Sequence, residues 1–246
     1  MRYLAQLSGG MDSLSAVETV LKREPLATCD LLHIQYREVG TIRWLAQLQA
    51  ALNQKRILQK KYKGAELNFI SPIICSREAI QGAPINYRES FYYHTLCASI
   101  GSQYKNTYTH VLNGTTKTDC DIIGIQWDEF STPQGDESSI YAGEKIFQHI
   151  VAYHGNSHLT RWRPVIGISK KELYAQLDSE LFATVWSCDS PILSGSTCTP
   201  CGMCTSCREY VVSAIPLHGA LSVEETLPIK QLFDQQISLF DSIIGS

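Results

Sequence analysis

Short apolar runs alternate with longer amphipathic stretches over the first two thirds of the chain. The apolar runs, which predict strands, are Tyr3–Leu7, Leu31–Tyr36, Leu67–Ile73 and Thr109–Asn113. The stretches with one apolar face, which predict helices, are Asp12–Arg23, Thr41–Tyr62 and Arg88–Tyr104. Repeated strand-helix-strand units predict an α/β fold with a parallel sheet and helices on both of its faces.

From residue 114 onward the chain has a different pattern. Residues 114–139 mix small, charged and turn-forming residues, and they predict a long loop of the kind that carries function. Ile140–Tyr153 predicts a helix, Ser169 is placed to cap another, and Thr226 is placed to cap an amphipathic tail that extends to Ile244. We therefore expect an α/β domain over residues 1–168 and a C-terminal helical region over residues 169–246.

Composition narrows the classes of protein that fit this pattern. With 44% hydrophobic and 18% charged residues, the chain of 246 residues falls among globular proteins and outside the disordered class. A formal net charge of -3 argues against a broad nucleic-acid surface, which needs clustered lysine and arginine. The chain has no apolar run of the roughly 18 residues that a membrane helix needs, and no signal-peptide core, so we expect a cytoplasmic protein without membrane contact.

A glycine turn follows the first expected strand and opens the first expected helix. It consists of Ser8, Gly9, Gly10, Met11, Asp12 and Ser13. The glycines let the backbone approach an anion, and the helix N-terminus offers N–H groups to a phosphate. Asp12 indicates a bound magnesium ion, a helix-capping role, or both. The pattern differs from the Walker loop and from the dinucleotide fingerprint, so neither a conventional ATPase nor a dehydrogenase is indicated.

Five of the nine cysteines crowd into a short stretch near the C-terminus. They are Cys188, Cys198, Cys201, Cys204 and Cys207. In a reducing compartment, this spacing predicts a metal site rather than disulfides. A tetrahedral zinc site takes four thiolates, which leaves one cysteine over, and an iron–sulfur cluster is the competing interpretation.

The hexapeptide Ser8–Ser13 resembles the signature of the PP-loop superfamily, whose members cleave ATP to AMP and pyrophosphate. The resemblance implies that MgATP is a substrate and that the loop residues bind its phosphates. In that superfamily, an oxygen of the second substrate attacks the α-phosphorus, and the usual product is an adenylated substrate.

The surroundings of the cysteines resemble one family within that superfamily, the 7-cyano-7-deazaguanine synthases. The resemblance lies in Trp186-Ser187-Cys188 followed by Cys201-x-x-Cys204-x-x-Cys207, and in Ser169-Lys170 after Pro164–Ile166. It implies a structural zinc ion bound by Cys188, Cys201, Cys204 and Cys207. Cys198 is then spare, with a set in which Cys198 replaces Cys188 as the alternative. A homodimer is also implied.

The family resemblance also implies a reaction. The enzyme adenylates a carboxylate on a 7-deazaguanine-like base, ammonia or another amine displaces AMP, and a second activation dehydrates the amide to a nitrile. Tyr87-Arg88-Glu89 is similar to a family element that carries an arginine. Arg88, Lys117 and Lys170 would neutralise developing charge, and Asp12, one of the loop residues that bind the phosphates, is the fourth expected catalytic residue.

The chain departs from the family where the deazaguanine substrate is expected to bind. It has Asn113-Gly114-Thr115-Thr116-Lys117-Thr118-Asp119-Cys120-Asp121 in place of the family's tyrosine, proline and arginine element. This departure leaves two alternatives open. A divergent relative, of the kind tied to bacterial antiviral defence, would join the activated base to a protein or another macromolecule. A non-catalytic nucleotide-binding scaffold is the alternative outside enzymes.

Overall fold

The computed structural model describes residues 1–36, 41–70, 73–75, 95–102, 107–122, 139–156 and 158–228. The chain begins with strand β1 (Arg2–Gln6), whose three central residues are buried, and continues into helix α1 (Met11–Arg23). Leu14, Val17 and Leu21 lie on the buried face of this helix, as their spacing predicts. The helix ends two residues before Pro25, which could not continue it.

A five-stranded parallel sheet forms the centre of the fold, in the order β4-β2-β1-β6-β7. The strands around β1 are β2 (Thr28–Leu32), β4 (Glu66–Phe69), β6 (His110–Leu112) and β7 (Thr160–Trp162). From β1 the chain builds the sheet first to one side, through β2 and β4, and then to the other, through β6 and β7. The order therefore reverses between β1 and β6, which is where open α/β sheets place their ligands.

Helices cover both faces of this sheet, as the alternation of strands and helices predicts. Side chains alternate along β1, so Tyr3 and Ala5 enter one hydrophobic cluster and Leu4 enters another. The first cluster includes residues of α1 and of α6 (Lys170–Gln176). The second includes residues of α5 (Ser139–Tyr153) and of the helical residues 95–102.

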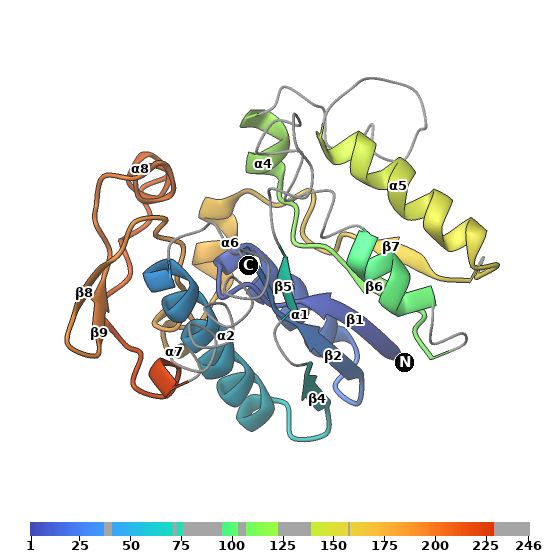
Figure 1. Cartoon of the computed structure of the whole chain (residues 1–246), viewed down its shortest axis with the longest axis horizontal. Coiled ribbons are helices and arrows are strands. Elements are labelled where there is room, and N and C mark those ends of the chain that lie inside the picture. Colours follow the sequence, from blue (N-terminus) through green and yellow to red (C-terminus); the bar gives the residue numbers. More distant parts are fainter. Residues whose placement is uncertain are drawn as a thin grey trace, which may run out of the picture.

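Helix α2 (Thr41–Lys61) packs against both the region of the central sheet and the C-terminal part of the chain. Ala51 and Leu58 pack in the cluster that holds α1. Trp44, Leu45 and Leu48 pack in a third cluster, together with residues of the segment 188–223, which we call the cysteine segment. Figure 1 shows this segment, in orange, standing beside α2.

The C-terminal region is less helical than expected. Its elements after α6 are α7 (Ser179–Phe182), β8 (Ile192–Ser194), β9 (Thr197–Thr199), α8 (Thr205–Val212) and β10 (Leu221–Ser222). The strands form an antiparallel sheet in the order β10-β9-β8. Gly195, with a φ of +59°, and Ser196 make the two-residue turn between β8 and β9. The expected C-terminal helical region therefore also contains a small antiparallel sheet, which the Gly-Ser turn makes possible.

Two of the predicted strands are broken in the structure. The expected strand Leu31–Tyr36 divides at His33 into β2 and β3 (Ile34–Tyr36), and the chain around Leu67–Ile73 divides into β4 and β5 (Ile73–Cys75). Strands β3 and β5 pair in parallel as a separate two-stranded sheet. The His33 Nδ1–H donates to the Leu7 carbonyl over 2.7 Å, so this side chain occupies the break.

The expected loop 114–139 begins with a short helix, α4 (Lys117–Ile122), which the sequence reading missed. A helical segment begins after Thr226, as expected, and the Thr226 hydroxyl donates to the Val223 carbonyl over 3.1 Å. Residues 123–138, the tail beyond residue 228, and Arg88 lie outside the described residues. None of the helices in the described ranges combines the length and apolar character that a membrane crossing requires.

Candidate functional site

The predicted phosphate loop, Ser8–Ser13, turns between the end of β1 and the first turn of α1. Gly9 has a φ of +88°, and a Cβ there would lie 2.5 Å from the backbone oxygen of Gln47 in α2. Only glycine suits both this backbone and this close approach. The Gly9 carbonyl accepts from the Gln54 side chain (2.7 Å) and from the Trp186 backbone N–H (2.8 Å). The loop is therefore held by α2 and by the chain that leads into the cysteine segment.

Two serines brace this loop from inside. Ser8 Oγ and Ser13 Oγ lie 2.9 Å apart, the Gly10 N–H donates to Ser8 Oγ (3.3 Å), and the Ser13 hydroxyl donates to the Gly10 carbonyl (3.2 Å). The N–H groups of Met11, Asp12 and Ser13 belong to the first turn of α1, where an α-helix supplies them with no carbonyl partner. With the positive end of the helix dipole, this turn suits a phosphate anion.

The loop lies at the point where the strand order reverses. Gly114 follows β6, the neighbour of β1, and a Cβ on it would lie 2.8 Å from both the Asp12 carbonyl carbon and the Ser13 nitrogen. The buried Asn113 side chain accepts from the Thr115 N–H over 2.7 Å and so shapes the turn that carries Gly114. The structure thus brings Gly114, at the start of the expected loop 114–139, against the predicted phosphate loop.

Lys170 collects three carboxylates beside the loop. Its Nζ lies 2.6 Å from Glu209 Oε1, 3.0 Å from Asp119 Oδ1 and 3.4 Å from Asp12 Oδ2. Lys170 begins α6 after a capping box formed by Ser169 and Glu172. The four residues come from α1, α4, α6 and α8, so they meet only in the folded chain.

Hydrogen bonds from α4 orient this cluster. Asp119 Oδ2 accepts from the Thr116 N–H and hydroxyl, both at 2.9 Å, which turns Oδ1 toward Lys170. The Lys170 N–H donates to Thr118 Oγ1 over 2.9 Å. This hydrogen bond holds the beginnings of α4 and α6 together beside the loop.

The charges in the cluster do not balance. With all groups ionised, three carboxylates and one ammonium carry a net charge of -2. Burial raises the pKa of Asp12 to about 7, with Lys170 opposing the rise and Asp119 and Glu209 adding to it. The side chain of Asp12 is 30% exposed, but its Oδ1 is buried and has no hydrogen-bond partner among the described residues. A carboxylate oxygen left in this way fits a hard cation such as Mg²⁺.

The lysine itself remains charged. Burial alone would lower the pKa of Lys170, but Asp12, Asp119 and Glu209 outweigh that effect and hold the pKa well above its usual range. The residue is 8% exposed, so its ammonium is a fixed positive charge at the edge of the phosphate loop. Chemically, the arrangement can bind an anion at the loop and a cation at the carboxylates.

The cysteine segment forms a second centre. The Sγ atoms of Cys188, Cys201, Cys204 and Cys207 all lie within 4.8 Å of one another, and the Cys188 and Cys204 sulfurs are 3.9 Å apart. A tetrahedral zinc with bonds of about 2.3 Å separates its sulfurs by roughly 3.8 Å, so the four residues fit zinc without a large movement.

No protein-family model matches the chain, and no curated protein sequence matches it either.

Backbone N–H groups point at these sulfurs. The Cys201 Sγ accepts from Met203 (3.4 Å) and Cys204 (3.3 Å), and these bonds lower the pKa of Cys201 to about 7. Gly202, with a φ of +73°, provides the turn that makes them possible. Cys198 is fully buried on β9 and is not part of the converging group, so the geometry favours the set with Cys188.

The remaining predicted residues do not all meet at the site. Lys117 opens α4, where its backbone N–H donates to the Ile168 carbonyl, and no contact of its ammonium with the cluster is found among the described residues. Arg88 lies outside the described residues. The sequence did not predict Glu209 as a partner of Lys170. Its only sequence signal is its position two residues after Cys207, within the cysteine segment.

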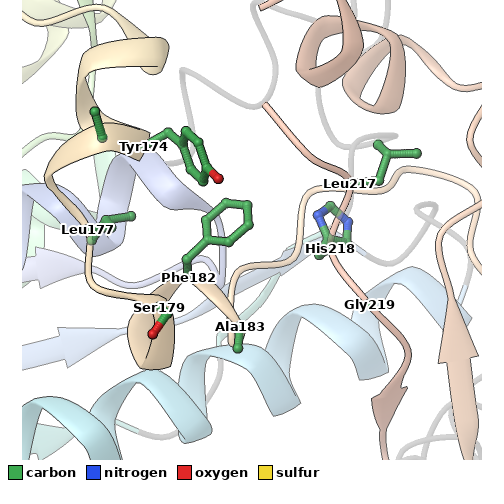
Figure 2. Close-up of a pocket in the computed structure, with 9 residues that line it drawn as sticks. Tyr174, Leu177, Ser179, Phe182, Ala183, Leu217, His218 and Gly219 are labelled. Carbon is green, nitrogen blue, oxygen red and sulfur yellow. The ribbon is translucent and has the colours of Figure 1, made fainter. Parts of the chain in front are cut away.

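A cavity of about 420 Å³ lies between α6, α7 and residues 217–219. In Figure 2 the rings of Tyr174 and Phe182 meet edge to face on one side, with an interplanar angle of 65°, and His218 stands across from them. His218 is 4% exposed, and burial lowers its pKa to about 4. Its Nε2 accepts from the Ser187 N–H (3.4 Å), and its ring packs at a tilt of 50° against that of Trp186, with 4.9 Å between the ring centroids. Trp186 is the residue whose backbone N–H bonds the Gly9 carbonyl of the loop. The neutral His218 ring packs between Trp186 and Tyr210 of the cysteine segment.

Proposed function

We propose that the chain is an ATP-dependent ligase that adenylates a carboxylate on a 7-deazaguanine-like base, releasing pyrophosphate and then AMP. The observation that carries the proposal is the meeting of Lys170, Asp12 and Asp119 at the phosphate loop, on a chain that also gathers four cysteines. The loop is at the reversal of strand order, where an α/β sheet binds ligands. The resemblance to the 7-cyano-7-deazaguanine synthases supports the choice of substrate.

In this proposal, the N–H groups at the start of α1 bind the β- and γ-phosphates, and Lys170 supplies a fixed positive charge beside them. A carboxylate oxygen of the base attacks the α-phosphorus. The bond to the β-phosphate oxygen breaks, and pyrophosphate leaves as the acyl-adenylate forms. Asp12 and Asp119 would hold Mg²⁺, which neutralises phosphate charge when it is bound. The protein contributes position and charge rather than a covalent bond.

Ammonia then attacks the acyl carbon, AMP leaves with the bonding electrons, and a proton is lost to give the amide. In a second round, the amide oxygen attacks the α-phosphorus of another ATP and pyrophosphate leaves. Loss of AMP and of both protons of the amide nitrogen then leaves the nitrile. The four thiolates of Cys188, Cys201, Cys204 and Cys207 occupy every position of a tetrahedral zinc, so zinc would hold the fold and take no part in these steps.

A second acceptor is favoured by one observation. Helix α4, with Lys117 and Asp119, stands where the resembling family carries a tyrosine, proline and arginine element. Because the residues at this place differ from the family element, they support an acceptor other than ammonia, such as an amine of a protein. The adenylation step is common to both acceptors.

Incubation with MgATP, 7-carboxy-7-deazaguanine and ammonium, followed by mass spectrometry, separates these possibilities. Amide and nitrile with matching AMP support the ammonia reaction. AMP and pyrophosphate without either product, and a mass increase on an added protein fraction, support the macromolecular acceptor. AMP release that stays at background and equals that of Asp12→Asn would reject catalysis and leave a nucleotide-binding scaffold.

A further inference from the structure

The shortest contact of the Lys170 ammonium is with a residue of the cysteine segment. Glu209 Oε1 lies 2.6 Å from Nζ, whereas the Asp119 and Asp12 oxygens lie 3.0 and 3.4 Å away. A charge-assisted hydrogen bond of this length is strong and directional. Glu209 therefore decides more than either aspartate where the ammonium sits.

The position of Glu209 depends in turn on the cysteines. It lies on α8, which begins after Cys204, and the Cys204 Sγ accepts from the Cys207 N–H in the first turn (3.5 Å). The next residue, Tyr210, is buried and packs edge-on against His218. Both ends of the short stretch around Glu209 are thus fixed, one by the thiol cluster and the other by the core.

A lysine side chain has four rotatable bonds, so it needs restraint before it can present its charge in one place. Without Glu209, Asp119 and Asp12 would draw the ammonium toward the α4 and α1 side. The separation of 39 residues between Lys170 and Glu209 shows that this restraint comes from tertiary structure rather than from local sequence.

We propose that Glu209 is a positioning residue for Lys170, through which the cysteine segment sets the affinity of the phosphate loop for the triphosphate of ATP. The inference rests on the proposed function, because it assigns Lys170 to the triphosphate. Glu209 is not a catalytic residue, since it acts on the nucleotide only through the lysine.

The test is a double-mutant cycle on nucleotide binding. Calorimetry with α,β-methylene-ATP and Mg²⁺ gives the Kd of wild type, Glu209→Gln, Lys170→Met and the double variant. The Gln side chain keeps the shape of Glu209 and removes its charge. We expect Glu209→Gln to weaken binding about tenfold in the wild-type background and less than twofold in the Lys170→Met background.

Glu224→Gln is the matched control, because the exposed Glu224 directly follows the cysteine segment but accepts from the Ser196 hydroxyl (3.1 Å) and does not contact Lys170. It should bind the analogue as wild type does, and zinc content should be equal in all variants. Unchanged or tighter binding by Glu209→Gln, or equal weakening with and without Lys170, overturns the positioning role alone. Failure of wild type to bind the analogue overturns the adenylation proposal, and the positioning role falls with it.

Discussion

Gly114 packs directly on the backbone of Asp12, so the turn after β6 and the phosphate loop after β1 cannot move independently. A Cβ at position 114 would lie 2.8 Å from the Asp12 carbonyl carbon and 2.9 Å from its oxygen. Backbone atoms inside a helix cannot yield to such a contact as the end of a side chain can. The turn that leads into α4 therefore contacts the predicted phosphate loop directly.

We expect Gly114→Ala to lower AMP formation at least tenfold, because the added methyl group displaces either the first turn of α1 or the turn before α4. Initial rates of AMP release with MgATP, at equal zinc content, measure the effect. Gly219→Ala is the control, since a Cβ at Gly219 meets nothing within 4 Å. A Gly114→Ala enzyme with wild-type rates would mean that the phosphate loop is not where the nucleotide is cleaved.

The cysteine geometry predicts which thiols hold metal. Cys201→Ser should lose the zinc and, with it, the folded structure of residues 188–223, because metal binding supplies much of the stability of such segments. Cys198→Ala should keep one zinc per chain, since Cys198 lies outside the converging group. Metal analysis and limited proteolysis measure both outcomes. Iron in the purified wild type, or zinc lost from Cys198→Ala, would contradict the assignment.

Asp12 should show opposite effects on stability and activity. Its pKa, raised to about 7 by burial, means that the folded chain binds this proton more tightly than the unfolded chain does. Stability then falls as pH rises from about 4 to about 7 and stays low above that. Asp12→Asn removes the free-energy cost of burying a charged carboxylate. At pH 8 we therefore expect the free energy of unfolding, measured with denaturant, to be about 1–3 kcal/mol higher in the variant. Its rate of AMP formation should be at least a hundredfold lower.

Asp119→Ala is the contrasting variant. It removes the acceptor of two hydrogen bonds from Thr116 at the start of α4, so it should destabilise the protein by about 1 kcal/mol. Equal losses of stability in the Asp12 and Asp119 variants would contradict the view that Asp12 is kept for its chemistry at the expense of the fold.

The sequence predicted local features of this molecule much better than the distant contacts. Periodicity located α1 and α2, and the spacing of the cysteines located the metal group, because each signal is contained in a few neighbouring residues. The break at His33 was missed, since an apolar run shows no sign of a side chain that bonds the backbone of another strand. Glu209 was missed for the same reason, because only folding brings it to Lys170.

Acid should weaken the fold through His218. Burial lowers the pKa of this histidine to about 4, whereas its ordinary value is 6.5, so the unfolded chain takes up the proton first as the pH falls. The stability that the neutral ring contributes is complete above about pH 6.5 and is lost progressively down to about pH 4. Between pH 7.5 and 5, this one group should cost about 2 kcal/mol.

Phenylalanine at this position keeps the contacts with the rings of Trp186 and Tyr210 but cannot be protonated. We expect His218→Phe to be less stable than wild type at pH 7.5, because the Ser187 N–H loses its acceptor, and to lose about 2 kcal/mol less on acidification to pH 5. Denaturant unfolding at both pH values, with zinc content checked in each sample, gives the comparison. His33 titrates in both proteins, so its contribution to the change in stability cancels in the comparison. Equal losses of stability in wild type and variant would mean that the buried His218 ring accepts a proton without disturbing the fold.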